Sequence, residues 1–240
     1  MKVLIFGATG MVGQGVLREC LIDKDIERVV TVGRNATGQQ VPKLTEIVHK
    51  DLFDLTSIEA ELTGFDACFF CLGVSSFRMS EADYTHLTYD LTFAVGKTLS
   101  RLDPGMTFSY VTGAGTDTTG RGRSMWARVK GRTENALLRM PFKAAYMYRP
   151  GMIQPMDGIR SKTAVYQMAI SLLRPLFPLM RRAFPNAITT TSQLGRAMIA
   201  VAREGAASRV LETRDITRYQ EGSSFVPACL ASAVRANHLS

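Results

Sequence analysis

Three glycines near the start of the chain have the spacing of a phosphate-binding turn. Gly7, Gly10 and Gly13 stand in the stretch VLIFGATGMVGQG, directly after an apolar run and before a helical pattern. Glycine lets the backbone turn sharply and approach a pyrophosphate closely, while the free N–H groups of a helix N-terminus donate to its oxygen atoms. The pattern predicts dinucleotide binding, and the alternative is a plain tight turn.

The residue that distinguishes NAD(H) from NADP(H) is expected at the end of the next strand. In NAD-binding proteins an acidic residue there binds the ribose 2′-OH, whereas this chain has Arg34 in the stretch TVGRN, with no Asp or Glu beside it. A guanidinium can bind a 2′-phosphate through two parallel hydrogen bonds. Arg34 therefore predicts NADP(H) rather than NAD(H), unless it is an arginine that only faces solvent.

Two further segments are expected to join the same crevice. Asp51 and Leu52 follow the third expected strand and are placed to contact an adenine, while Cys71, Leu72 and Gly73 end the fourth. Ligands of open α/β sheets bind at the carboxyl ends of the strands, near the point where the strand order reverses. We therefore expect these residues to line the cofactor site.

The stretch SMWARVKGRTE, residues 124–134, combines an aromatic and a basic residue at helical spacing. Trp126 and Lys130 are four residues apart, so a helix places them on one face. An indole N–H does not exchange a proton near neutral pH. Trp126 can therefore supply aromatic surface to a site but no acid–base chemistry.

Alternating strands and helices must position these residues. Apolar runs predict strands at 2–6, 28–32, 45–49, 67–72, 106–112, 144–148 and 208–212. Helices are expected over 11–23, 81–102 and 192–204, the second with a stripe formed by Leu87, Leu91, Val95, Leu99 and Leu102. Strands that are apolar nearly throughout indicate a parallel sheet covered on both faces. The sequence thus predicts a doubly wound α/β sheet of the Rossmann type.

The rhythm changes after Pro150. We expect residues 1–240 to form a single NAD(P)-binding domain, in which 151–205 make a small helical lobe on the substrate side. Segment 160–184 is rich in Met, Leu and Phe but is broken by Pro175 and Pro178, and its apolar stretches are too short for a bilayer of about 30 Å. A helix over the site is expected, with a peripheral membrane anchor or a face for a protein partner or second copy as alternatives.

Charge is distributed unevenly along the chain, whose net charge is +8. Residues 1–120 contain 10 basic and 15 acidic side chains, whereas residues 121–240 contain 19 and 6. The basic half is suited to an anionic substrate, a membrane surface or an acidic partner, unless it is only a solvated face. Nucleic acid is not expected, because the basic residues of 121–132 adjoin the predicted cofactor crevice and do not form a platform of interleaved aromatic residues.

Cysteines and histidines predict neither a disulfide framework nor a metal site. Cys68 and Cys71 have C-x-x-C spacing, but on a strand an odd separation sends the two sulfurs to opposite faces. The three histidines are isolated. Because the first expected strand begins at residue 2, no signal peptide is expected and a cytoplasmic location is predicted.

In order and spacing, GATGMVG, DL at 51–52, CLG at 71–73 and YRPGMI at 148–153 resemble the short-chain dehydrogenase/reductase superfamily in its extended or atypical branch. CLGVSS, the Y-D-L at 89–91 and VKGRTE are similar to the NADPH-binding Tat-interacting-protein group and its sugar-epimerase-like bacterial relatives. The resemblance covers about residues 1–205 and implies a Rossmann fold. Besides the residues above, it implies cofactor contacts from Thr9, Met11, Val12, Lys130, Pro150, Gly151 and Met152.

The resemblance also implies a catalytic set. Members of the superfamily use a Ser or Thr after the fifth strand and Y-x-x-x-K on the next helix; the Tyr exchanges the proton, and the Lys holds the nicotinamide ribose and lowers the pKa of the Tyr. Thr112 matches the Ser/Thr and Lys130 the Lys, whereas Trp126 stands at the Tyr position. Water or another hydroxyl would have to replace the Tyr, the candidates being Ser124, Tyr84 and Tyr89.

Two functions are consistent with these residues. One is an NADP(H)-dependent oxidoreductase or epimerase-like enzyme that acts on a small substrate, in which Thr112 and Lys130 polarise the reacting group. The other is a non-catalytic NADPH-binding sensor or regulatory module that docks a protein partner through its basic half and 160–184.

Overall fold

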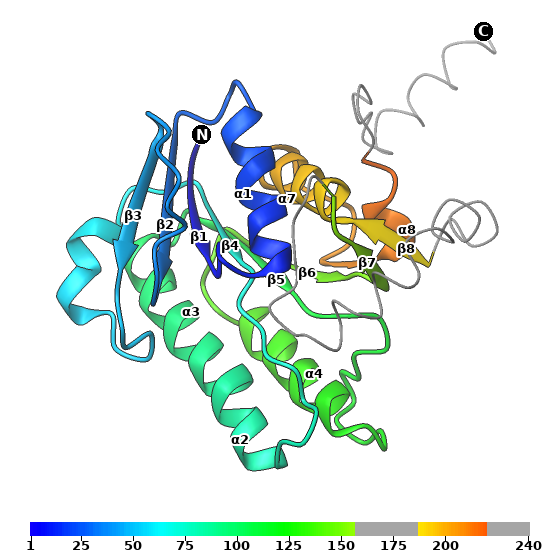
Figure 1. Cartoon of the computed structure of the whole chain (residues 1–240). Helices are drawn as coiled ribbons and strands as arrows, with labels where there is room; N and C mark the ends of the chain where they lie inside the picture. Colours follow the sequence, from blue (N-terminus) through cyan, green and yellow to red (C-terminus); the bar gives the residue numbers. More distant parts are fainter. Residues whose placement is uncertain (157–186, 220–240) are drawn as a thin grey trace, which may run out of the picture.

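A seven-stranded, wholly parallel sheet forms the centre of the molecule in the computed structural model, which describes residues 1–156 and 187–219 (Figure 1). From one edge to the other the strands are β3 (Leu44–Val48), β2 (Arg28–Gly33), β1 (Lys2–Phe6), β4 (Ala67–Phe70), β5 (Thr107–Val111), β6 (Ala144–Arg149) and β9 (Val210–Glu212). Each strand lies within two residues of its predicted position at both ends. The prediction of a doubly wound parallel sheet is confirmed.

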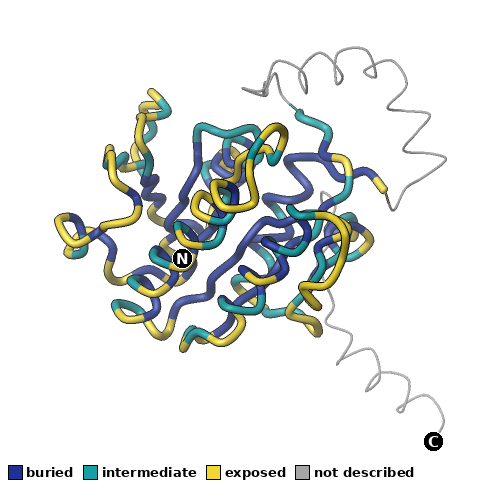
Figure 2. The backbone as a smooth tube through the Cα atoms, turned by 90° about the horizontal axis from the view of Figure 1, so that it is seen from below, coloured by how far each residue is buried: buried dark blue, intermediate teal, exposed yellow. Residues whose placement is uncertain are grey.

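Helices cover both faces of this sheet. Helices α1 (Met11–Ile22) and α7 (Thr191–Glu204) lie on one face, and α3 (Leu91–Leu102) and α4 (Met125–Leu137) lie on the other (Figure 1). Alternate residues of one strand therefore enter different cores: Val3 and Ile5 pack under α1, while Leu4 and Phe6 pack toward α3. Figure 2 shows the buried strands enclosed by helices whose outer faces are exposed.

The predicted helix 81–102 contains a phase shift. It consists of α2 (Glu81–Thr85), a π-helical turn (His86–Asp90) and α3. A π-helical turn holds more residues than an α-helical one, so the residues before α3 are rotated relative to its apolar stripe. The prediction that Leu87 belongs to that stripe is wrong, since Leu87 is 38% exposed and Tyr84 and Thr88 are buried in its place.

The strand order reverses between β1 and β4. The chain leaves β1 toward β2 on one side and returns to β4 on the other, so the sheet is wound in both directions from this pair. The carboxyl ends of the two strands lie level, because Phe6 pairs with Phe70 and the Cys71 N–H donates to the Phe6 carbonyl at 2.9 Å. A crevice at this place is where ligands of such sheets bind.

Helix α7 packs tightly against α1, the helix that follows the glycine turn. A β-carbon on Gly15 of α1 would lie 2.4 Å from the Thr191 β-carbon, so only glycine permits this approach. Glu19, which is 2% exposed, forms ion pairs with Arg18 and with Arg196 of α7. Residues 191–204 are therefore part of the helical layer on the sheet.

A second, two-stranded sheet lies beyond β6. Strands β7 (Met152–Gln154) and β8 (Ile188–Thr190) are parallel neighbours, with Met152 opposite Ile188 and Gln154 opposite Thr190. Together with α7 they are the described part of the segment 151–205 that the sequence assigns to a substrate-side lobe. The remainder, including the segment 160–184 with Pro175 and Pro178, lies outside the described residues.

Smaller features complete the described part of the chain. A 3-10 helix spans Thr56–Leu62, and α8 spans Thr213–Ile216. Cys68 is buried on the α3 side of the sheet, while Cys71 packs against the α1 side, as predicted for residues an odd number apart. Within residues 1–156 and 187–219, no helix is long and apolar enough to cross a bilayer, and no three His, Cys, Asp or Glu side chains gather as metal ligands would.

Candidate functional site

The three early glycines form one bend between β1 and α1. Gly7 has a φ of +83°, and its carbonyl accepts a hydrogen bond from the Gly10 N–H at 3.0 Å, which closes the turn. The Gly10 carbonyl then accepts from the Gln14 N–H at 2.9 Å and begins the helix. A β-carbon on Gly13 would lie 2.1 Å from the Gly7 carbonyl oxygen, so a side chain there is incompatible with the bend.

The start of α1 is equipped to bind an anion. The N-cap residue is Gly10, which makes no side-chain cap, and the first turn contains no acidic residue. The N–H groups of Met11, Val12 and Gly13 therefore stand at the positive end of the helix without a capping side chain. A glycine cradle that a β-carbon would fill and an uncapped helix N-terminus fit a dinucleotide pyrophosphate.

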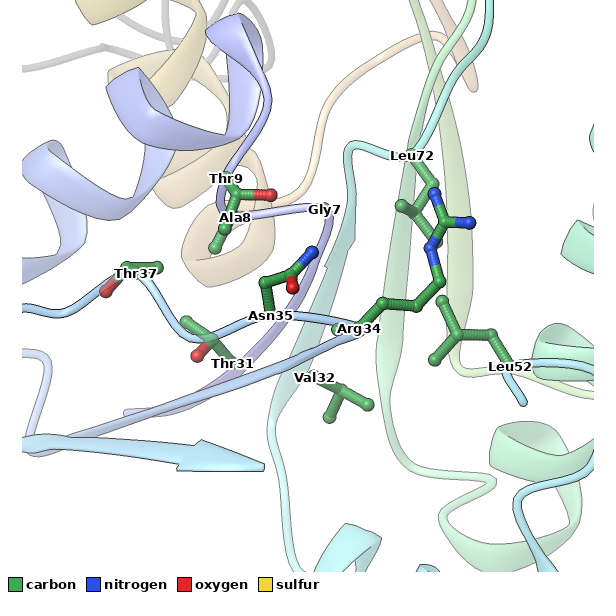
Figure 3. A pocket seen from close by; sticks show the side chains of 11 residues that line it. Gly7, Ala8, Thr9, Thr31, Val32, Arg34, Asn35, Thr37, Leu52 and Leu72 are labelled. Carbon is green, nitrogen blue, oxygen red and sulfur yellow. The ribbon is translucent and has the colours of Figure 1, made fainter. Parts of the chain in front are cut away.

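A pocket opens directly from this turn toward the ends of β2 and β4 (Figure 3). It is lined by residues from four segments: Gly7, Ala8, Thr9, Thr31, Val32, Gly33, Arg34, Asn35, Thr37, Leu52 and Leu72. The structure thus brings together the glycine turn and the predicted contacts Thr9, Arg34, Leu52 and Leu72. Ligands of open α/β sheets bind at such a place, outside the carboxyl ends of the strands.

The other predicted contacts at this edge lie beside the pocket. Asp51 is exposed, and its Oδ1 accepts a hydrogen bond from the Phe53 N–H at 2.9 Å, so it shapes its own turn. Cys71 is half-buried in the core under α1, where burial raises the pKa of its thiol to about 12. Gly73 is exposed beyond the end of β4. Contacts from these residues to a cofactor stay predictions.

Arg34 lies where a 2′-phosphate reader is expected. Its exposed side chain extends from the end of β2 toward Leu52 and Leu72 (Figure 3), and among the described residues its guanidinium has no hydrogen-bond or ion-pair partner. The nearby carboxylate of Glu46 is already engaged, because it accepts from the Thr37 N–H at 2.6 Å and the Gly38 N–H at 3.1 Å. The pocket therefore offers a cation without a competing ion pair.

Thr112 follows β5, at the predicted place for the Ser/Thr, but its hydroxyl is turned into the protein. The residue is 7% exposed, and Oγ1 donates to Glu134 Oε1 at 2.7 Å and lies 3.1 Å from the Tyr148 carbonyl oxygen. A hydroxyl has one hydrogen to donate, and here a buried carboxylate takes it. In this geometry Thr112 cannot donate to a substrate.

Lys130 lies one helical turn beyond Trp126 and reaches the end of β5. Its Nζ donates to the Thr112 carbonyl at 2.8 Å. Burial lowers the pKa of Lys130 to about 8, and the Glu134 carboxylate offsets part of this effect. A lysine with such a pKa exchanges protons near neutral pH.

Trp126 packs along the loop after β5. Atoms of its ring lie 3.9 Å and 3.8 Å from the positions that β-carbons on Gly113 and Gly115 would occupy. The loop is held down at both ends, since the Ala114 N–H donates to the Pro150 carbonyl and the Asp117 N–H to the Ala127 carbonyl. The indole is therefore a half-buried wall at the carboxyl edge of the sheet.

The replacement hydroxyls suggested by the sequence lie in different surroundings. Tyr84 is 2% exposed, and burial raises the pKa of its phenol. Tyr89 lines a separate pocket between the π-helical turn and α4, where the guanidinium of Arg132 lies 5.5 Å from its ring centre. Ser124 is the exposed N-cap residue of α4, and its side chain makes no cap hydrogen bond.

Sequence reasoning missed a buried ionic network behind Thr112. Glu134 is fully buried and pairs with Arg149 at the end of β6, whose Nε lies 3.0 Å from Glu134 Oε1. Arg149 also contacts Glu212 of β9 at 3.2 Å, and the two carboxylates raise its pKa. The sequence signal for this network was the acidic residue four positions after Lys130, at the end of VKGRTE.

The stretch after β6 is anchored by the same edge of the sheet. The Pro150 carbonyl accepts from the Ala114 N–H at 2.9 Å, and the Gly151 N–H donates to Thr213 Oγ1 at 2.8 Å. Met152, which begins β7, is 37% exposed. The structure places all three residues at the carboxyl end of the sheet, and their contact with a cofactor stays a prediction.

The fold is shared with solved NAD-binding epimerases and dehydratases, and the resemblance seen in the sequence is confirmed at the level of fold. The chain is similar to dTDP-glucose 4,6-dehydratase DesIV from Streptomyces venezuelae, solved with NAD bound, with a TM-score of 0.63 and 17% identity over 91% of this chain and 79% of that one. It is similar to UDP-galactose 4-epimerase with a TM-score of 0.63 and 18% identity, over 88% of this chain and 75% of the other. No protein-family model matches the chain.

Fungal proteins are the curated relatives at sequence level. The chain is 26% identical to Protein fmp52-2, mitochondrial, from Aspergillus oryzae, over 89% of this chain and 94% of that protein. It is 23% identical to Protein FMP52-1, mitochondrial, from Scheffersomyces stipitis, over 73% and 77% respectively. These names overturn the prediction of a cytoplasmic location. That prediction used the apolar residues 2–6, which form β1 and carry no information on compartment.

Proposed function

We propose that the chain binds NADP(H) and uses it as an oxidoreductase or epimerase-like enzyme on a small substrate. The observation that carries the proposal is the pocket that joins the glycine turn to Arg34. The turn offers uncapped N–H groups to a pyrophosphate, and Arg34 offers two parallel donors to a 2′-phosphate. Solved structures of similar fold contain NAD, which supports a nicotinamide dinucleotide as the ligand.

Replacing Arg34 by aspartate tests the choice of cofactor. Because charge-assisted hydrogen bonds contribute about 1.5–3 kcal/mol each, we expect R34D to weaken NADPH binding about 100-fold and to bind NADH at least as well as the wild type. Fluorescence titration with both nucleotides measures the change. Arg28→Asp, at the amino end of the same strand, changes the charge equally and should leave the preference unaltered. Equal NADPH affinity before and after R34D would exclude Arg34 as the reader.

Lys130 and Trp126 support the assignment of an enzyme. A bound reduced nicotinamide supplies hydride, and the protein supplies position, exclusion of water and protons. Lys130 stands at the carboxyl end of β5 and titrates near neutral pH, while Trp126 walls the loop beside it. The basic second half of the chain favours an anionic substrate.

One observation favours a second function, a non-catalytic NADPH-binding sensor that docks a protein partner. The Thr112 hydroxyl, which the family pattern assigns to the substrate, donates to Glu134 instead. With Trp126 in the Tyr position, two of three expected catalytic groups then lack a proton for a substrate. For location, the names of the fungal relatives favour mitochondria.

The variant Trp126→Tyr separates the two functions. A positioned phenol contributes about 10²–10⁴-fold to proton transfer, so W126Y should raise NADPH-dependent reduction of aldehydes, ketones or o-quinones at least about 10-fold in an enzyme. Absorbance of NADPH reports turnover, and fluorescence titration reports binding. If wild type and W126Y bind NADPH equally and neither reduces any compound, the enzyme assignment is wrong and the sensor stands. Trp126→Phe is the matched control, since it keeps the ring without the hydroxyl.

A further inference from the structure

With tryptophan in the tyrosine position, the site needs another source for the proton of a carbonyl reduction. This question rests on the proposed function. The Thr112 hydroxyl donates to Glu134, Tyr84 is 2% exposed, and Tyr89 lines a different pocket. The aliphatic hydroxyl of Ser124 has no pKa in the physiological range and could only relay a proton. Among Thr112, Trp126 and Lys130, the residues at the three catalytic positions, one ionisable donor is left.

That donor is the ammonium group of Lys130. It is on the same face of α4 as Trp126, one turn later, and is fixed at the end of β5 by a 2.8 Å hydrogen bond from Nζ to the Thr112 carbonyl. A lysine ammonium has three N–H donors, and among the described residues the Thr112 carbonyl is the single acceptor that Nζ contacts. Two of its N–H bonds therefore have no acceptor among the described residues.

The residue that holds Lys130 is itself held by hydrogen bonds. Thr112, whose carbonyl holds Nζ, has its N–H bound to the Tyr148 carbonyl at 2.8 Å and its hydroxyl bound to Glu134. Glu134 lies on α4 itself, and its charge is matched by Arg149 of β6, which in turn contacts Glu212 of β9. These are the charged groups behind the site. Desolvation is the larger effect at Lys130 and brings the pKa of its ammonium to about 8, although the Glu134 carboxylate acts in the opposite direction.

We propose that Lys130 is the proton donor of this site, in the role that the tyrosine has in the related enzymes. As hydride from a reduced nicotinamide dinucleotide adds to the carbonyl carbon, an Nζ–H bond of Lys130 breaks and the proton forms an O–H bond with the carbonyl oxygen. The electron pair stays on nitrogen, and the neutral amine regains a proton from solvent. Trp126 then serves as an apolar wall that keeps the lysine poorly solvated.

The pH dependence of the wild type tests this directly. Only the protonated lysine donates, so turnover in the direction of carbonyl reduction should be constant below the pKa of Lys130, near 8, and fall about 10-fold per unit above it. In W126Y, whose phenol takes over, this fall should move to higher pH. Proton donation by water would give a rate without this limb, and that result would overturn the proposal.

Lys130→Arg is the decisive variant, because it keeps a cation but does not give up a proton in the accessible range. We expect K130R to bind NADPH and to lose about 100-fold or more of the turnover. Lys143→Arg, the same change on an exposed lysine before β6, is the control and should be unchanged. Turnover of K130R within a few fold of wild type would mean that Lys130 only positions the cofactor, with the proposed function intact.

A readout independent of turnover covers the case in which K130R does not fold. Competitive acetylation of the wild-type protein, followed by mass spectrometry, gives the titration of each lysine between about pH 6 and about pH 11. Lys130 should become reactive near pH 8, and exposed Lys143 serves as the reference lysine in the same sample. Titration of both residues together would overturn the proposal. Absence of turnover in both wild type and W126Y would instead refute the proposed function.

Discussion

Alanine at position 13 is expected to abolish dinucleotide binding. The added β-carbon would lie 2.1 Å from the Gly7 carbonyl oxygen and 2.7 Å from the Gly7 carbonyl carbon, so the bend between β1 and α1 must open. Since the clash is with backbone atoms, no side-chain rotation relieves it. We expect the affinity for NADPH to fall more than about 100-fold and the free energy of unfolding to fall by about 1–3 kcal/mol.

Fluorescence titration and urea denaturation measure the two effects of Gly13→Ala. Gly105→Ala is the control, because Gly105 is exposed and nothing lies within 4 Å of the added carbon. It should leave both quantities unchanged. NADPH affinity within a few fold of wild type in G13A would show that the pyrophosphate does not bind at this bend, and the cofactor assignment would fail with it.

Loss of the Glu134 carboxylate should have the largest effect on stability. Glu134→Ala leaves the guanidinium of Arg149, whose side chain is 13% exposed, with the more exposed Glu212 as its remaining partner. It also leaves the Thr112 hydroxyl with only the Tyr148 carbonyl, at 3.1 Å, as an acceptor. Breaking a buried ion pair by removing one partner costs about 3–5 kcal/mol. The midpoint of urea denaturation at neutral pH is the measurement.

The matched control is Glu81→Ala, which breaks the exposed ion pair between Glu81 and Arg128 of the same helix α4. Exposed pairs contribute about 0–1 kcal/mol, so this variant should unfold nearly as the wild type does. Equal effects of the two substitutions would mean that the interior pair is no more important than a surface one. Thr112→Val then separates the hydroxyl from the ion pair, since it removes the donor alone.

Most of the fold could be predicted from the sequence, because its elements are encoded locally. Short, largely apolar runs mark most of the seven strands, and the glycine triplet identifies the first turn. Short or irregular elements could not be predicted this way. Strands β7 and β8 have three residues each, which is too short for a periodic pattern. The apolar pattern of 81–102 contains no sign of the π-helical turn at His86–Asp90, which leaves Leu87 exposed in the structure.

The positions of the candidate site residues could be predicted, but the orientation of their side chains could not. The resemblance to the short-chain dehydrogenases/reductases implied that Thr112, Trp126 and Lys130 lie at one edge of the sheet, and the structure has them there, while their role stays a prediction. The Thr112 hydroxyl points toward Glu134. From the sequence alone, Glu134 looks like an ordinary exposed residue of a helix. A buried charge is identified by its tertiary partner, Arg149, and this partner is 15 residues away in the chain.

The small β7–β8 sheet has an evolutionary consequence. Because Gln154 and Thr190 are direct neighbours across two short parallel strands, the end of β7 fixes the place at which α7 begins. Relatives that keep this pairing should therefore keep the packing of α7 on α1, whatever their sequence differences elsewhere.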